Sequence, residues 1–92
     1  MNVTVEYKTQ VKVAAGVSSE QVELSEPSPL KTIIHQLAEK HGDPLKNILL
    51  DSDGNLQPAI LLFLGDRQLR WDEDVKLGDG DTLTIFTPIS GG

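Results

Sequence analysis

The chain of 92 residues is long enough for one domain and too short for two. It contains no cysteine, which excludes a disulfide scaffold, a thiolate metal site and a cysteine nucleophile. Its net charge of −6 repels phosphate backbones, so we expect no nucleic-acid partner and regard a basic protein surface as the more natural one. The alternative is that the acidity only aids solubility.

The sequence shows no sign of membrane targeting. The N-terminus lacks the basic region followed by an apolar stretch that marks a signal peptide. The longest apolar run, residues 59–64, is too short to span a bilayer. We therefore expect no membrane partner and a cytoplasmic location. Hydrophobic residues make up 38% of the chain, which is enough for one thin core beneath a single sheet.

The N-terminal part carries the pattern of β-strands. Apolar side chains alternate with polar ones over residues 1–7, which is the period of a half-buried strand. The two valines of residues 11–13 extend this alternation weakly, before residues 14–16 break it. Residues 21–24 indicate a second short strand. The two strands are therefore predicted to form a hairpin with an irregular link.

An amphipathic helix is predicted to follow the hairpin. Proline cannot donate to a strand ladder but is tolerated in the first helical turn, so the helix is expected to begin at Ser28 or Pro29. Five apolar residues then recur with the spacing of one helix face: Leu30, Ile33, Ile34, Leu37 and Ala38. Gly42 ends the pattern. The main helix is thus predicted over about residues 29–42, packed on one face of the sheet.

The second half of the chain indicates three more strands. A short helical turn is expected at residues 45–50 and a polar turn at residues 51–55. The strands are predicted at residues 58–64, 68–71 and 82–87. The last strand is expected to return beside the first, parallel to it. This order predicts an α+β fold of the β-grasp type, with a mixed sheet of four to five strands.

The last strand has two different faces. If Leu83 and Ile85 face the helix, alternation places Phe86 on the opposite face of the sheet. There the ring either anchors a partner or packs on another outer-face side chain, such as Leu69 or Trp71. Both alternatives are kept open.

The chain after the last strand is predicted to leave the sheet. Pro88 removes a backbone donor, so we expect a β-grasp domain over residues 1–88 and a flexible tail over residues 89–92. Gly91 and Gly92 carry no side chain, so a narrow channel can admit their backbone and reach the terminal carboxylate. The alternative is a frayed terminus that happens to be glycine.

The stretch LGDGDTLTIFTPISGG, residues 77–92, resembles the end of MoaD/ThiS-type sulfur carriers. Their endings carry a leucine, a spacer, Asp-Gly-Asp, an alternating apolar strand, a proline, an apolar and a small residue, and Gly-Gly. The place of Pro88, two residues before the small Ser90, is more similar to the MoaD-type branch. The element order across all 92 residues agrees, which implies a ubiquitin-like β-grasp fold.

The resemblance implies a carrier with no catalytic residue, cofactor or metal of its own. An E1-like adenylating enzyme uses ATP and Mg²⁺ to activate the carboxylate of Gly92. A sulfur donor such as a cysteine desulfurase or rhodanese then converts it to a thiocarboxylate. The tail that enters the enzyme is formed by Pro88, Ile89, Ser90 and Gly91. Phe86, which alternation places on the outer face beside this tail, is the predicted partner-binding residue. An acceptor synthase subunit finally takes the sulfur in cofactor, amino-acid or tRNA biosynthesis, as in molybdopterin synthase, whose small subunit such a carrier can form.

Two other functions are compatible with the same sequence. A ubiquitin-like modifier is conjugated through Gly92 to target lysines, after the same activation step. A plain β-grasp binding module has an inert tail, and its deletion changes nothing.

Three further motifs are assigned to structure. The acidic residues of 51–55 resemble the opening of a calcium loop but lack its glycine and its closing acid, so a turn is predicted and no metal is expected. His35 and His41 are assigned solvated or helix-capping roles. The acidic run at residues 72–74 is interpreted as a solvated bend.

Overall fold

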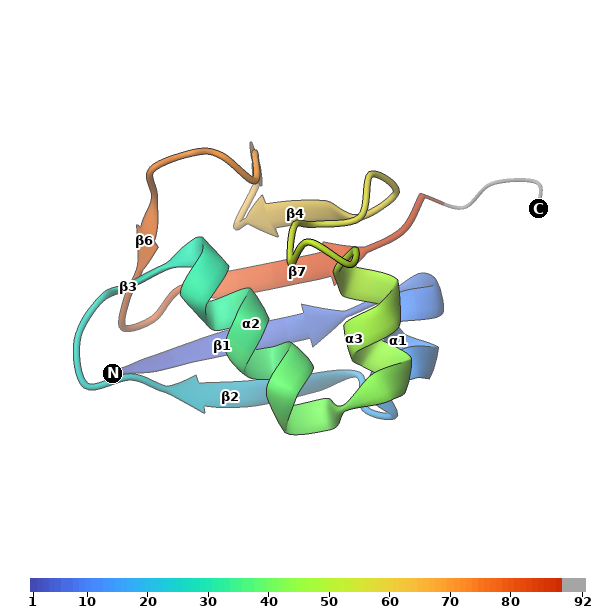
Figure 1. Ribbon diagram of the computed structural model, residues 1–92. Coiled ribbons are helices and arrows are strands. Elements are labelled where there is room, and N and C mark those ends of the chain that lie inside the picture. Colours follow the sequence, from blue (N-terminus) through green and yellow to red (C-terminus); the bar gives the residue numbers. More distant parts are fainter. Residues whose placement is uncertain (89–92) are drawn as a thin grey trace.

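The computed structural model describes residues 1–88, in which one mixed sheet is covered on one face by helices (Figure 1). The strand order of this sheet is β2-β1-β7-β4-β5. Its strands are β1 (Asn2–Tyr7), β2 (Ser19–Glu23), β4 (Leu61–Leu64), β5 (Arg67–Leu69) and β7 (Thr82–Phe86). Neighbouring strands are antiparallel except β1 and β7, which are parallel. The predicted α+β β-grasp fold is confirmed.

The last strand lies at the centre of the sheet, as its sequence predicted. β7 pairs with β1 on one side, from Thr4 opposite Thr82 to Tyr7 opposite Ile85, and with β4 on the other. The alternating apolar side chains of β1 and β7 are at most 1% exposed and face the helices: Val3, Val5, Tyr7, Leu83 and Ile85. Alternation therefore gives β7 one buried face and one outer face.

The main helix and the helix that follows it close the core. In α2 (Leu30–His41) the five predicted stripe residues are all buried. Gly42 then takes a φ of 80°, which favours glycine, and redirects the chain into α3 (Asp43–Leu49). Leu45 and Leu49 of α3 are fully buried, so the short helical turn expected there is a packed helix.

The link between the first two strands is a helix, and the prediction of an irregular link with strand-like valines is wrong. This helix, α1 (Thr9–Ala15), buries Val11 completely and leaves Val13 73% exposed. A strand would place both valines on the same face, whereas a helix rotates them about 200° apart. Gly16, with a φ of 80°, ends α1 and donates its backbone N–H to the carbonyl of Lys12.

A second pairing was absent from the sequence prediction. Two short strands, β3 (Ser28–Pro29) and β6 (Lys76–Leu77), form an antiparallel two-stranded sheet. The first residues assigned to the main helix are therefore extended, and α2 begins one residue later, at Leu30. Such two-residue strands have no periodicity of their own, because their pairing depends on segments that lie far apart in the sequence.

Of the helices within residues 1–88, none has the length and apolar character required to cross a bilayer.

The helical assignment of residues 9–15 predicts unequal effects for the two valines of α1. Val11→Ala should lower the free energy of unfolding by about 2 kcal/mol, because it removes two buried methyl groups. Val13→Ala should change it by less than about 0.5 kcal/mol, because that side chain is exposed and alanine favours helices. Urea unfolding of both variants measures the difference. Equal losses would support a strand instead.

Candidate functional site

The root of the tail lies at the end of the central strand. Thr87 and Pro88 directly follow β7, at the end of the sheet where α1 lies and opposite the N-terminus (Figure 1). Pro88 is exposed. The other predicted tail residues, Ile89, Ser90, Gly91 and Gly92, lie outside the described residues. The C-terminal tail therefore starts from the middle of the sheet rather than from its edge.

Phe86 lies on the outer face of the sheet, as alternation predicted. Its ring stacks on that of Phe63, with centroids 5.7 Å apart and an interplanar angle of 23°. It is also opposite Leu61 in the β4–β7 register. All three side chains are partly exposed. We call Leu61, Phe63 and Phe86 the aromatic patch.

The sequence left open whether Phe86 packs on a neighbour or serves a partner, and the structure is compatible with both. Its ring packs on Phe63 and remains partly exposed. The neighbours suggested from the sequence were wrong. Leu69 is buried on the inner face, at 4% exposure. Trp71 packs instead against His35 and Lys31. Phe63 was missed, although its alternate position in the predicted strand of residues 58–64 places it on the same face as Phe86.

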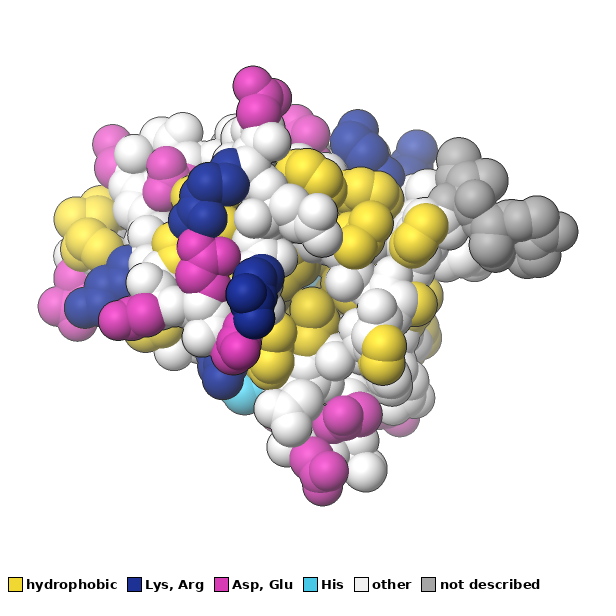
Figure 2. All heavy atoms as spheres, turned by 90° about the horizontal axis from the view of Figure 1, so that it is seen from above, with side chains coloured by type: hydrophobic (Ala, Val, Ile, Leu, Met, Phe, Trp, Pro, Cys, Tyr) yellow, Lys and Arg dark blue, Asp and Glu magenta, His cyan; other side chains and the backbone are white. Residues whose placement is uncertain are grey.

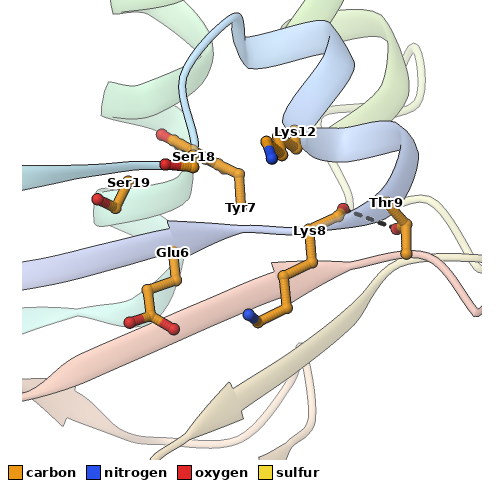
Figure 3. A pocket seen from close by; sticks show the side chains of 7 residues that line it. All are labelled: Glu6, Tyr7, Lys8, Thr9, Lys12, Ser18 and Ser19. Carbon is orange, nitrogen blue, oxygen red and sulfur yellow. Dashed lines mark hydrogen bonds between the residues drawn. The ribbon is translucent and has the colours of Figure 1, made fainter.

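Polar and charged groups surround this end of the sheet. A surface hollow of ≈ 370 Å³ is lined by residues of β1, α1 and the start of β2, among them Glu6, Lys8, Thr9 and Lys12. The side chains of Glu6 and Lys8 leave the same side of β1 (Figure 3). On the face viewed in Figure 2, hydrophobic side chains gather toward the end where β7 stops, and most acidic ones lie elsewhere. This surface suits contact with another macromolecule more than enclosure of a small molecule.

A cluster centred on Glu20 ties the sheet to the end of α2 on the inner face. The Glu20 carboxylate accepts hydrogen bonds from the Tyr7 hydroxyl and Lys40 Nζ, both at 2.5 Å, and from His41 Nε2. The rings of Tyr7 and His41 also meet edge to face, with centroids 5.9 Å apart. The solvated or capping role predicted for His41 is therefore wrong, since its partner is a carboxylate 21 positions away.

These contacts stabilise the ionised form of Glu20. Burial opposes its charge, but the hydrogen bonds from Lys40, Tyr7 and His41 outweigh burial and lower the pKa of Glu20 to about 2. Burial and the hydrogen bond to Glu20 raise the pKa of Tyr7 above its usual range, so its hydroxyl remains a donor. The groups satisfy one another's hydrogen bonds, and we interpret the cluster as a structural latch.

The other histidine and the acidic segments also have structural roles. His35 Nε2 lies 2.9 Å from the carbonyl oxygen of Gly54 and ties α2 to the turn at residues 51–55. In the predicted acidic bend, Glu73 accepts hydrogen bonds from Arg67 and the backbone of Arg70, which lower the pKa of Glu73. Over residues 1–88, no three acidic or histidine side chains converge as metal ligands.

The strand order and the helix packed across one face define a ubiquitin-like β-grasp protein. The sequence profile of the ThiS family matches residues 5–92, and the chain belongs to this family. This confirms the resemblance found in residues 77–92. Its relatives include small sulfur carrier proteins.

Similar proteins are found in several organisms. A protein of Archaeoglobus fulgidus assigned as a sulfur carrier is 28% identical over 86 residues, which cover 90% of this chain and 97% of that one. Small archaeal modifier protein 1 of Haloferax volcanii superposes with a TM-score of 0.84, at 21% identity and full coverage of both chains. A chain of the Amycolatopsis orientalis BexX/CysO complex has a TM-score of 0.72, with 27% identity, 98% coverage of this chain and 99% of that one.

The latch at Glu20 predicts a pH-dependent contribution to stability. Because the folded-state pKa of Glu20 is lower than the unfolded one, the contribution is present above about pH 4.5 and is lost as the pH falls to about 2. Glu20→Gln should therefore cost about 1–3 kcal/mol near neutral pH. The difference in the free energy of unfolding between Glu20→Gln and wild type should shrink as the pH falls toward 2.

Urea unfolding at several pH values measures this difference. Glu23→Gln, on the same strand and exposed, is the matched control and should leave the wild-type profile unchanged. A Glu20→Gln loss of constant size between pH 7 and pH 2 would contradict the assignment.

Proposed function

We propose that this protein carries sulfur on its C-terminal carboxylate, at Gly92. The observation that supports this most is the position of the tail. The central strand of a ThiS-family β-grasp domain ends at Phe86, and the chain continues through Pro88 to a terminal Gly-Gly. The described sheet thus ends where the sequence leads into the Gly-Gly segment to which the proposal assigns the reactive carboxylate.

The proposed reaction uses a partner's chemistry on this carrier's carboxylate. A carboxylate is a poor electrophile, so it first attacks the α-phosphate of ATP·Mg²⁺ in an E1-like enzyme, and pyrophosphate leaves. A sulfur donor such as a cysteine desulfurase or rhodanese then displaces AMP from the acyl-adenylate. The terminal sulfur of the donor's persulfide is then bonded to the Gly92 carbonyl as an acyl disulfide. A thiol of the partner cleaves this S–S bond, which leaves a thiocarboxylate on Gly92 and a disulfide on the partner. The carrier contributes position and affinity, and the enzymes contribute the catalytic groups.

The aromatic patch is the proposed docking surface for the E1-like enzyme. Phe63 and Phe86 are large, partly exposed rings of the kind that dominate protein interfaces. Phe86 precedes Gly92 by six residues, which reach at most about 22 Å when extended. The patch therefore lies close enough to the reactive end for one partner to hold both. A chain of the BexX/CysO complex is similar to this protein, which supports a protein partner for it.

The same proposal includes the acceptor of the sulfur and an alternative product. The acceptor is a synthase subunit in cofactor, amino-acid or tRNA biosynthesis, and this chain can form the small subunit of such a synthase. The alternative product is an amide bond from Gly92 to a target lysine, as in a ubiquitin-like modifier. The likeness to small archaeal modifier protein 1 favours keeping this alternative. Both routes require the same activation of the tail.

Activation should depend on the position of the terminal carboxylate. Deleting Gly92, or adding one alanine after it, should abolish adenylate formation, because the reactive group is displaced by one residue. The free energy of unfolding should stay within about 0.5 kcal/mol of wild type, since the change lies beyond the sheet. ATP–pyrophosphate exchange with an E1-like enzyme of the same genome measures activation. An extended chain that is still adenylated would refute the proposal.

The aromatic patch should matter more to binding than to folding. Phe86→Ala should weaken binding to the E1-like enzyme roughly 30-fold or more, as expected for a central interface anchor. Its cost to the free energy of unfolding should be about 1 kcal/mol, from the lost stacking on Phe63. Titration calorimetry and urea unfolding give the two values.

The matched control for Phe86→Ala is Gln21→Ala. Gln21 lies on β2, opposite Thr4 in the β1–β2 register, away from the patch. Its replacement should leave binding unchanged. Intact binding by a destabilised Phe86→Ala chain would show that the ring serves packing alone.

A further inference from the structure

Thr9 has an unusual backbone conformation directly beside the tail root. Its φ of 55° makes it the one non-glycine residue with a positive φ among residues 1–88. A β-branched residue rarely adopts this left-handed conformation, because its Cβ crowds the backbone. Such strain persists only where the surroundings fix it, and it gathers at functional positions. The contacts of Thr9 therefore indicate what its side chain is needed for.

The Thr9 hydroxyl forms a group of hydrogen bonds with the residue that precedes Pro88. Its Oγ1 accepts the backbone N–H of Thr87 at 3.0 Å and lies 3.0 Å from Thr87 Oγ1. Its own proton faces two carbonyl oxygens, that of Lys8 at 2.6 Å and that of Thr87 at 3.0 Å. Figure 3 shows this hydroxyl directed back toward Lys8 at the turn from β1 into α1. We call the Thr9–Thr87 contact the clasp.

The clasp continues the parallel ladder after the first strand has turned away. The last backbone bond between the two strands runs from the Lys8 N–H to the Ile85 carbonyl, at 3.0 Å. In a regular parallel ladder the next donor, the Thr87 N–H, would bond to the carbonyl of Lys8. Here the Thr9 hydroxyl accepts that N–H instead. One side chain thus extends the ordered part of the chain to Thr87.

A turn alone does not require threonine at this position. Glycine adopts a φ of 55° without strain and would end β1 at the same place. What threonine adds is the hydroxyl, and its contacts are with the tail root. The strained residue is therefore explained by the clasp and not by the turn.

We infer that Thr9 is a positioning residue for the reactive C-terminus, because its clasp on Thr87 fixes where the tail begins and in which direction it leaves. This inference rests on the proposed function. From Thr87 to Gly92 there are five residues, a reach of at most about 18 Å. When the clasp is lost, Thr87 joins the free segment. The enzyme must then order more backbone before the carboxylate reaches ATP.

The test compares Thr9→Gly, which keeps the turn and removes the hydroxyl, with Thr9→Ser, which keeps the hydroxyl. ATP–pyrophosphate exchange is measured over a range of carrier concentrations. Thr9→Gly should raise KM for the carrier roughly 5- to 30-fold, the cost of ordering one further residue, with kcat changed less than about twofold. Thr9→Ser should stay within about twofold of wild type. Amide exchange at Thr87 should accelerate in Thr9→Gly only.

Every other outcome contradicts either the proposed function or the positioning role of Thr9. A wild-type chain that is never adenylated contradicts the proposed function. An active wild type with an unchanged KM in Thr9→Gly contradicts the positioning role, as does a Thr9→Ser variant that is equally impaired. If Thr9→Gly fails to fold, the KM of Thr87→Val tests the positioning role instead. It removes only the Thr87 hydroxyl from the clasp and should raise KM by a smaller factor, and an unchanged KM contradicts the role.

Discussion

The parallel pairing of β1 with β7 is the constraint on which the rest of the structure depends. It joins residues 4–7 to residues 82–85 and places the last strand between β1 and β4, at the centre of the sheet. The core forms because both strands direct their apolar residues to the same face, beneath α2 and α3. The same pairing determines where the chain leaves the domain. A C-terminus that follows this central strand starts from a segment that is paired on both sides.

The two faces of the sheet have separate roles in this account. The inner face holds the core, and the Glu20 latch joins its edge to the end of α2. The outer face carries the aromatic patch next to the tail root. Because β7 contributes Ile85 to the core and Phe86 to the patch, the strand that anchors the domain also aligns the proposed docking surface with the tail. The Thr9 clasp adds one further fixed residue to this arrangement.

The sequence predicted the elements whose periodicity is local. The alternation of β1 and β7 and the stripe of α2 gave the sheet, the main helix and the outer position of Phe86. The two valines of α1 were misread because seven residues contain too few turns to separate a helical period from an alternating one. The partners of Phe86, Glu20 and Thr9 could not be read from local patterns. Each depends on which distant strands become neighbours, and this is decided by the tertiary fold.

The measurement that tests the central claim most directly is the intact mass of the protein purified from its own cells, with fragmentation of its C-terminal peptide. Exchange of oxygen for sulfur at Gly92 shifts the mass nearly as much as oxidation of Met1, so fragmentation must locate the change. The account predicts a sulfur-for-oxygen shift on Gly92. A branched Gly92–lysine peptide would instead identify a modifier. A tail that stays unmodified, even with an E1-like enzyme, ATP and a sulfur donor added, would contradict the account.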